Sequence, residues 1–396
     1  MMKNTPNLYD TVVHILGQHS HWLDKRHFYT LTWMIVGLIE SKTISLPEWA
    51  TFVDSRAAFV QSTVRRFSRW LHNKRIEVHG LYGPIIQEAL SEWNENTIYI
   101  ALDTSMLWGT FCHIRISVIY RGRAVPLIWK TIEHGSSSIS FESYQPLLKK
   151  AAKLLPLGCN VVFLADRGFA DTNLMEYVSQ TLDWHWRIRI KSSYLVFRRN
   201  KRRCKISSIK LQRGQARFWH NVYITDKRFG IVHLALANPR GTKEKWLIVS
   251  DQPTDVATFD EYGYRFDIEE NFLDDKSNGF QLESSLIRSA DAISRLCFVL
   301  AVTTLFLVCQ GTEVVETGKR RWVDAHWYRG NSYLKIGWKW VRRAFIKGYA
   351  LITQLRLSPL PDPELAMASR KQEKERNNLS FSIRFDVFTP YKTCSS

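Results

Sequence analysis

The order of strand-like and helical segments between residues 97 and 193 restricts the fold more than any other feature of the sequence. Three apolar runs of strand character come in direct succession, at residues 97–105, 112–122 and 123–132. Successive strands of this kind form a meander, whereas strands separated by a helix pair in parallel. The next segments are read as helix (140–155), strand (160–169), helix (171–182) and strand (184–193). The order predicts an α/β fold with a mixed sheet and helices packed on it.

The segments on either side of this region differ from it in pattern. Apolar residues recur at helical spacing before residue 95, and short alternating runs with Gly, Asn and Pro turns fill residues 192–253. A long helix is predicted over residues 255–276, and the segment 369–378 is highly charged. The predicted division is a helical domain (1–95), the first part of the core (96–191), a β-rich insertion (192–253), the second part of the core (254–310) and a basic helical C-terminal region (311–396).

The charge balance indicates a polyanionic partner. The formal net charge is +18, and the chain contains 15 Trp, whose faces can stack on bases while cations pair with phosphates. A basic helix near residues 60–75 carries Arg65, Arg66 and Arg69. It is either a DNA-reading helix of the N-terminal domain or a solvated helical face. A basic enzyme without a nucleic-acid partner is the alternative interpretation of the charge.

Cysteine usage and hydropathy exclude other classes. The six Cys are scattered without a CxxC pair, so neither a zinc site nor a disulfide framework is indicated. This usage and the absence of a secretory signal pattern lead us to expect a cytoplasmic protein. The apolar run Leu296–Cys309 is too short to cross a bilayer comfortably, and we expect a buried core helix there.

Two acids follow apolar strands. Asp103 ends the run IALD, and Asp166 ends the run VVFLAD. Strand ends of this kind open onto the crevice in which ligands bind, and a carboxylate there costs free energy unless something compensates it. The alternative is that each Asp caps the next element, and the turn ADRGF fits that interpretation.

A third acid is selected by helix geometry. On an α-helix, Tyr262, Arg265, Glu269 and Lys276 would lie within roughly 60° of one another, because each residue turns by about 100°. Glu270 and the aspartates of the same segment fall off this stripe. Carboxylates supply hard ligands for divalent metals, and Arg, Lys and Tyr donors suit a phosphate. The alternative is a salt-bridged amphipathic helix in which Arg265 and Glu269 form an ordinary i,i+4 pair.

The spacing Tyr262-x2-Arg265-x3-Glu269-x6-Lys276 resembles the signature of bacterial DDE transposases of insertion-sequence family four, the cut-and-paste, hairpin-forming type. The segments IALDTS, VVFLADRGF and KEKWLIVSD resemble further regions of that family. The resemblance covers about residues 95–310.

This resemblance implies a ribonuclease-H-like core in which Asp103, Asp166 and Glu269 bind two Mg²⁺, with Mn²⁺ as a possible substitute. The expected partners are the terminal inverted repeats and target DNA, bound by a homodimer in the synaptic complex, in the bacterial cytoplasm. The other implied roles are phosphate binding by Tyr262, Arg265 and Lys276, stacking of a flipped base on Trp246, and DNA contacts by Arg187 and Arg189. For Trp246 a core position is the alternative.

The implied reaction is nicking, hairpin formation and opening, and strand transfer, all by in-line displacement at one metal site. Two alternatives remain open at this stage. One is a metal-dependent nuclease of the same fold, and the other is a domesticated DNA-binding protein without catalysis.

Overall fold

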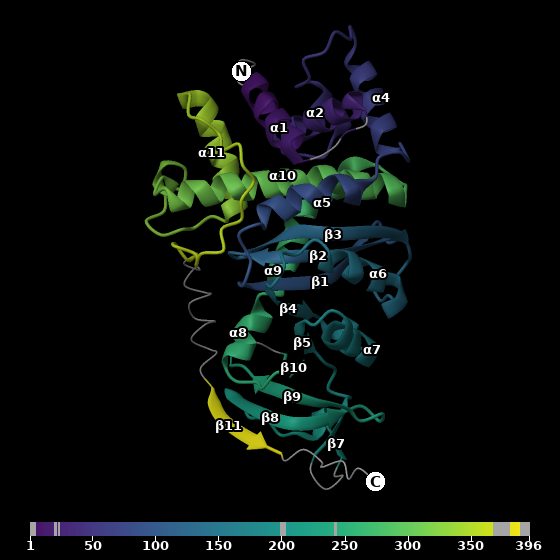
Figure 1. Cartoon of the computed structure of the whole chain (residues 1–396), viewed down its shortest axis with the longest axis vertical. Coiled ribbons are helices and arrows are strands. Elements are labelled where there is room, and N and C mark those ends of the chain that lie inside the picture. Colours follow the sequence, from purple (N-terminus) through teal and green to yellow (C-terminus); the bar gives the residue numbers. More distant parts are fainter. Residues whose placement is uncertain are drawn as a thin grey trace.

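One continuous sheet runs through the computed structural model, which describes residues 5–19, 22, 24–198, 203–240, 244–366 and 381–388. Among these residues the sheet has 11 strands in the order β3-β2-β1-β4-β5-β10-β9-β8-β6-β7, with β11 paired to β8 (Figure 1). The first five strands are β1 (Thr97–Leu107), β2 (Phe111–Tyr120), β3 (Arg123–Glu133), β4 (Asn160–Ala165) and β5 (His185–Arg189).

These five strands have the predicted arrangement. β1, β2 and β3 form an antiparallel meander, and β4 pairs in parallel with both β1 and β5. The crossovers contain α6 (Phe141–Ala152) and α7 (Thr172–Glu176). The mixed α/β sheet with flanking helices is therefore confirmed.

The β-rich segment lengthens the same sheet. Its last strand, β10, pairs antiparallel with β5, so Ile248 lies opposite Arg189. The β-rich segment therefore extends the core sheet beyond β5. Its strands are β6 (Leu195–Phe197), β7 (Arg203–Lys205), β8 (Gln215–Ile224), β9 (Phe229–Asn238) and β10 (Trp246–Ser250).

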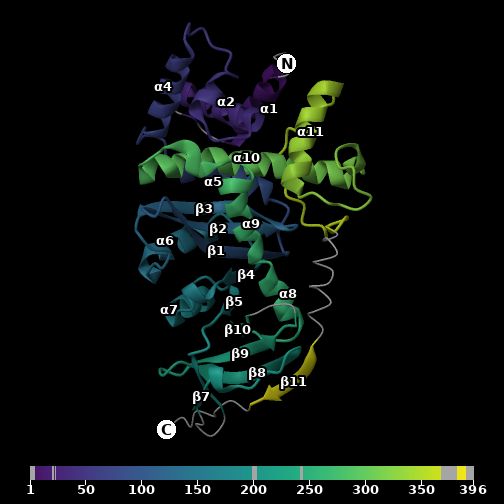
Figure 2. The same cartoon turned by 180° about the vertical axis from the view of Figure 1, so that it is seen from behind.

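Helices cover both faces of the meander. Alternate residues of β1 enter different apolar clusters, because successive side chains point to opposite faces. Ala101 packs with Ile268 and Phe272 of α9 (Phe266–Leu273), whereas Ile100 and Leu102 belong to the large core that contains α6 and α10 (Ala290–Glu316). Figure 2 shows α9 in front of β1–β3, with α10 crossing between the sheet and the N-terminal helices.

The predicted core helix is α10. It is long and apolar enough to cross a membrane, but 94% of its most apolar window is buried inside the protein. It contacts β3 and the helices at both ends of the chain, and Trp129 of β3 donates to the Ser294 carbonyl at 2.9 Å. The helices around it are α1 (Thr5–His19), α2 (Lys25–Ser41), α3 (Leu46–Ala50), α4 (Val60–Leu71), α5 (Val78–Ala89) and α11 (Tyr333–Lys347).

Two secondary-structure predictions are wrong, one for residues 255–276 and one for the C-terminal region. The single helix predicted over residues 255–276 is divided into α8 (Ala257–Gly263), α9 and a π-helix, η6 (Asp274–Asn278). At the first break the backbone tightens, because the Arg265 N–H bonds to the Tyr262 carbonyl, three residues earlier.

The C-terminal region, predicted to be helical, also contains β11 (Ser382–Val387). This strand pairs in parallel with residues 215–220 of β8, whose partner β6 covers residues 223 and 224. Phe385 stacks on Phe218 with ring centroids 4.8 Å apart. The charged segment 369–378 lies outside the described residues.

Candidate functional site

Strand register places Asp103 beside Asp166. The last paired residues of β1 and β4 are Leu102 and Ala165, so the two acids occupy the next position on adjacent parallel strands. Adjacent strands lie about 5 Å apart. Asp103 does not end its strand as expected, because β1 continues to Leu107 through its pairing with β2. The proximity of the acids follows from the parallel pairing.

Burial and charge both act on Asp103. Burial raises the pKa of its carboxyl, the neighbouring Asp166 raises it further, and Arg265 and the Thr104 N–H oppose this effect. Asp166 also caps the short 3₁₀ turn Arg167–Phe169 by accepting from the Arg167 N–H. Asp166 therefore caps the next element, as the alternative interpretation expected, and also lies beside Asp103.

Arg265 joins the helix acid to the strand acid. Its Nη1 donates to Asp103 Oδ2 at 3.2 Å, and its Nη2 contacts Glu269 Oε1 one turn later. The side chains of Arg265, Asp103 and Glu269 are 5%, 16% and 48% exposed. Three charged groups in contact therefore extend from the buried Asp103 on β1 to the solvent-accessible carboxylate of Glu269 on α9.

The carboxylate donors suit a hard divalent cation such as Mg²⁺. The pKa of Asp103 is raised in part by Asp166, so a cation between these acids would relieve a repulsion that the fold creates. Among the described residues, however, no three His, Cys, Asp or Glu side chains are gathered closely enough to hold a metal ion. The Arg265 guanidinium lies between Asp103 and Glu269, and it must shift if both acids are to bind one ion.

The π-helix separates Lys276 from the stripe on which it was predicted. Lys276 Nζ donates to the Met106 carbonyl at 2.5 Å and lies 3.4 Å from Glu283. The predicted stripe requires a regular α-helix through residue 276, but η6 has a wider turn. The prediction that Lys276 shares one helix face with Tyr262, Arg265 and Glu269 is therefore wrong. Lys276 still lies near the end of β1.

Two buried donors near the acids have no hydrogen-bond partner within the described part of the chain. They are the Tyr262 hydroxyl and Arg265 Nε. Burial raises the pKa of Tyr262, Arg265 lowers it, and the charges of Asp166 and Asp103 raise it further. Unsatisfied buried donors are costly, so this arrangement fits an acceptor such as a phosphate oxygen.

Trp246 packs in an aromatic cluster beside this region. It begins β10, is half-buried, and has ring centroids 6.1 Å from Phe259, 6.2 Å from Tyr262 and 6.1 Å from Phe266. The core position given as the alternative is thus partly realised. The base-stacking role stays a prediction.

The DNA contact expected for Arg187 is wrong. Its side chain is buried, and it donates to Glu261 at 2.8 Å, to Ser250 at 3.0 Å and to Gln252 at 2.9 Å. These partners leave the guanidinium with a structural role. Arg189 is partly buried, with 14% of its side chain exposed, and it donates to Glu244 at 2.6 Å.

The other acids of the helix segment anchor it to the sheet. Asp275 lies 2.6 Å from Arg115 of β2, Asp274 lies 3.3 Å from Arg123 of β3, and Glu270 is 3.9 Å from the same Arg123. Arg115 also donates to Asn271 of α9 at 2.8 Å. Sequence reasoning missed Arg115, although a charged residue inside the apolar run of β2 was a usable signal.

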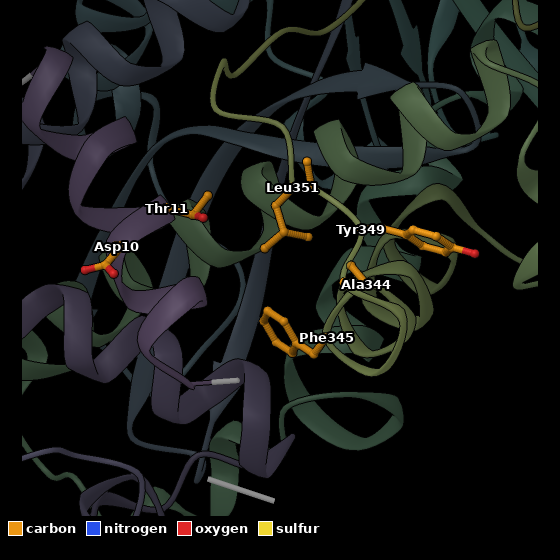
Figure 3. A pocket seen from close by; sticks show the side chains of 8 residues that line it. Asp10, Thr11, Ala344, Phe345, Tyr349 and Leu351 are labelled. Atoms are coloured by element: carbon orange, nitrogen blue, oxygen red, sulfur yellow. The ribbon is translucent and has the colours of Figure 1, made fainter. Parts of the chain in front are cut away.

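Two other features lie away from the acids. On α4, Arg65 and Arg69 are exposed and Arg66 is half-buried, so two of these cations could reach a partner. A pocket of about 430 Å³ lies between α1 and the end of α11 (Figure 3). None of the three acids lines it; its lining comprises Asp10, Thr11, Ala344, Phe345, Gly348, Tyr349, Ala350 and Leu351.

The chain is similar in structure to a known transposase and has no match among protein families or curated proteins. No protein-family model and no curated protein matches the sequence. A piggyBac transposase, solved as a synaptic complex with hairpin DNA, is similar with a TM-score of 0.42 and 11% sequence identity. The similarity covers 95% of this chain and 84% of the transposase chain.

Proposed function

We propose that this chain is a DDE-type DNA transposase with a ribonuclease-H-like core. The observation that carries the proposal is the placement of Asp103 and Asp166 at neighbouring positions on adjacent parallel strands. Arg265 contacts both Asp103 and Glu269, and so places the helix acid on the same side of the sheet edge as this pair. The strand order β3-β2-β1-β4-β5, with an antiparallel meander followed by parallel strands, supports the proposed core.

Asp103, Asp166 and Glu269 would hold Mg²⁺, two ions by resemblance, with Mn²⁺ as a substitute. Bound there, the metal would activate the attacking oxygen and stabilise the leaving oxygen of an in-line phosphoryl displacement. The chain's own part is to place these carboxylates and to orient DNA. The unpartnered donors of Tyr262 and Arg265 suit a phosphate oxygen, and Lys276 adds a cation near the end of β1.

Each proposed step exchanges one P–O bond for another. In nicking, a water oxygen bonds to phosphorus and the P–O3′ bond breaks, so that the departing oxygen takes a proton and becomes a 3′-hydroxyl. That hydroxyl attacks the opposite strand to form a hairpin, water reopens the hairpin, and the same hydroxyl then attacks target DNA. The partners of the proposed reaction are the element's terminal inverted repeats and target DNA, with a homodimer holding two ends in the cytoplasm.

The test uses labelled duplexes taken from the DNA that borders the reading frame. Incubation with plasmid and Mg²⁺ should join label to the plasmid, whereas an Asp103→Asn variant should bind the duplex without cutting it. Cutting without joining would instead indicate a nuclease. Binding without either reaction in the unaltered protein would indicate a DNA-binding protein without catalysis.

A further inference from the structure

We propose that a cationic stripe on α11, continued by Lys42, binds the phosphates of DNA that extends from the candidate site. This inference rests on the proposed function, because it assigns a surface to the same substrate. The stripe consists of the exposed cations Lys335, Lys339 and Arg342. Their spacing of four and three residues places them on one face of the helix.

The charged residues of α11 are all positive. Its 15 residues include five cations and no acid. No ion pair is formed by Lys335, Lys339 or Arg342 within the described part of the chain. Cations on a surface helix are usually interspersed with acids, which offset their mutual repulsion. The helix therefore presents a positive face that contains no acid of its own.

Lys42 extends the stripe onto a second element. It follows the end of α2, and its Nζ lies 5.2 Å from the centre of the Trp338 ring of α11. Burial lowers the pKa of Lys42, and the charges of Arg342 and Lys339 lower it further. Glu40 lies within electrostatic reach of Arg342 and Lys42, but burial raises its pKa. Bound anions would relieve the repulsion among these cations.

The stripe begins next to the helix segment that carries the candidate site. Trp338 packs on Phe280, just beyond η6, with ring centroids 5.2 Å apart. The charge of Lys335 acts on Asp274 of η6 and lowers its pKa, against the larger effect of burial. η6 follows α9 directly, so a chain of contacts leads from Glu269 to the stripe.

A DNA duplex fits this surface better than a compact anion does. One α11 turn rises about 5.4 Å, so Lys335, Lys339 and Arg342 span about two turns. Duplex phosphates recur about every 3.4 Å of helix axis along each strand, so a row of this length can face several of them, and every neutralised phosphate releases counterions. An extended row of cations can therefore neutralise several phosphates at once.

The test compares two variants that each lose three positive charges. In the α11 variant, Lys335, Lys339 and Arg342 become Gln. In the control, Lys149, Lys150 and Lys153 become Gln; these residues are exposed on α6 and the position after it, on the opposite side of the molecule from α11 in both Figure 1 and Figure 2. Fluorescence anisotropy of a labelled mixed-sequence duplex gives the Kd of each protein between about 50 and 200 mM salt.

The slope of log Kd against log salt should fall by about three in the α11 variant, because each lost phosphate contact removes about 0.9. The control should keep the slope of the unaltered protein. Equal slopes in all three proteins, or equal losses in both variants, would overturn the inference and leave the proposed function standing. If the unaltered protein binds no duplex, the proposed function fails together with the inference.

Discussion

The buried pair between Arg115 and Asp275 predicts a large loss of stability when one partner is removed. The two side chains are 2% and 3% exposed, and Arg115 Nη2 lies 2.6 Å from Asp275 Oδ2. Arg115 also donates to Asn271 at 2.8 Å and to His113 at 3.2 Å, and its guanidinium lies 4.8 Å from the Phe272 ring centre. Arg115→Met therefore leaves a carboxylate and two polar side chains without their partner.

Removing one member of a buried ion pair typically costs about 3–5 kcal/mol, since the remaining charge stays desolvated. We expect Arg115→Met to lower the free energy of unfolding by this amount in urea denaturation followed by circular dichroism. The double variant Arg115→Met with Asp275→Leu should recover much of the loss, because apolar residues can replace a buried pair.

The matched control is the exposed pair between Arg356 and Glu92, whose atoms are 2.7 Å apart but whose side chains are 45% and 47% exposed. Arg356→Met should cost no more than about 1 kcal/mol. If Arg115→Met costs as little as Arg356→Met, the pair does not hold α9 and η6 on the sheet and does not position Glu269.

Two further predictions concern metal and pH. Mg²⁺ should raise the melting temperature of the unaltered protein and not that of Asp103→Asn, because a ligand that binds only the folded state stabilises it; an equal rise in both would place the ion elsewhere. Burial lowers the pKa of His233 to about 4, with the neighbouring His220 adding to the effect. An unfolded His has a pKa of about 6.5, so the unfolded chain binds more protons than the folded chain between these two values. Stability therefore falls as the pH falls from about 6.5 to about 4. His233→Gln should flatten this loss in urea titrations, and an unchanged pH profile would contradict the assignment.

The mixed sheet could be predicted from sequence because three apolar runs in direct succession are followed by two more that helical segments separate. That pattern also placed Asp103 and Asp166 after buried segments. Their actual relation depends on the register between β1 and β4, which no local pattern encodes. The extension of β1 beyond Asp103 was missed for the same reason, since pairing with β2 maintains that part of the strand.

The helix phase could not be predicted from a uniform period. The backbone tightens at Arg265 and widens in η6, where Asp275 is held by Arg115 and Asp274 by Arg123. The departure from α-helical geometry thus coincides with ion pairs to residues far away in the sequence, which a local period does not encode. The DNA contact of Arg187 was expected from the family resemblance, whereas its partners Glu261 and Gln252 come from segments distant in sequence that no local pattern links to it.

Strand cleavage by two neighbouring glutamate variants tests the central claim most directly. Glu269 is joined to Asp103 through Arg265, whereas Glu270 is exposed and lies 3.9 Å from Arg123. Glu269→Ala should abolish Mg²⁺-dependent nicking of an element end while leaving binding of that end intact, and Glu270→Ala should nick it at nearly the unaltered rate. Loss of nicking in Glu270→Ala with activity retained in Glu269→Ala would contradict the claim that Asp103, Asp166 and Glu269 form one site.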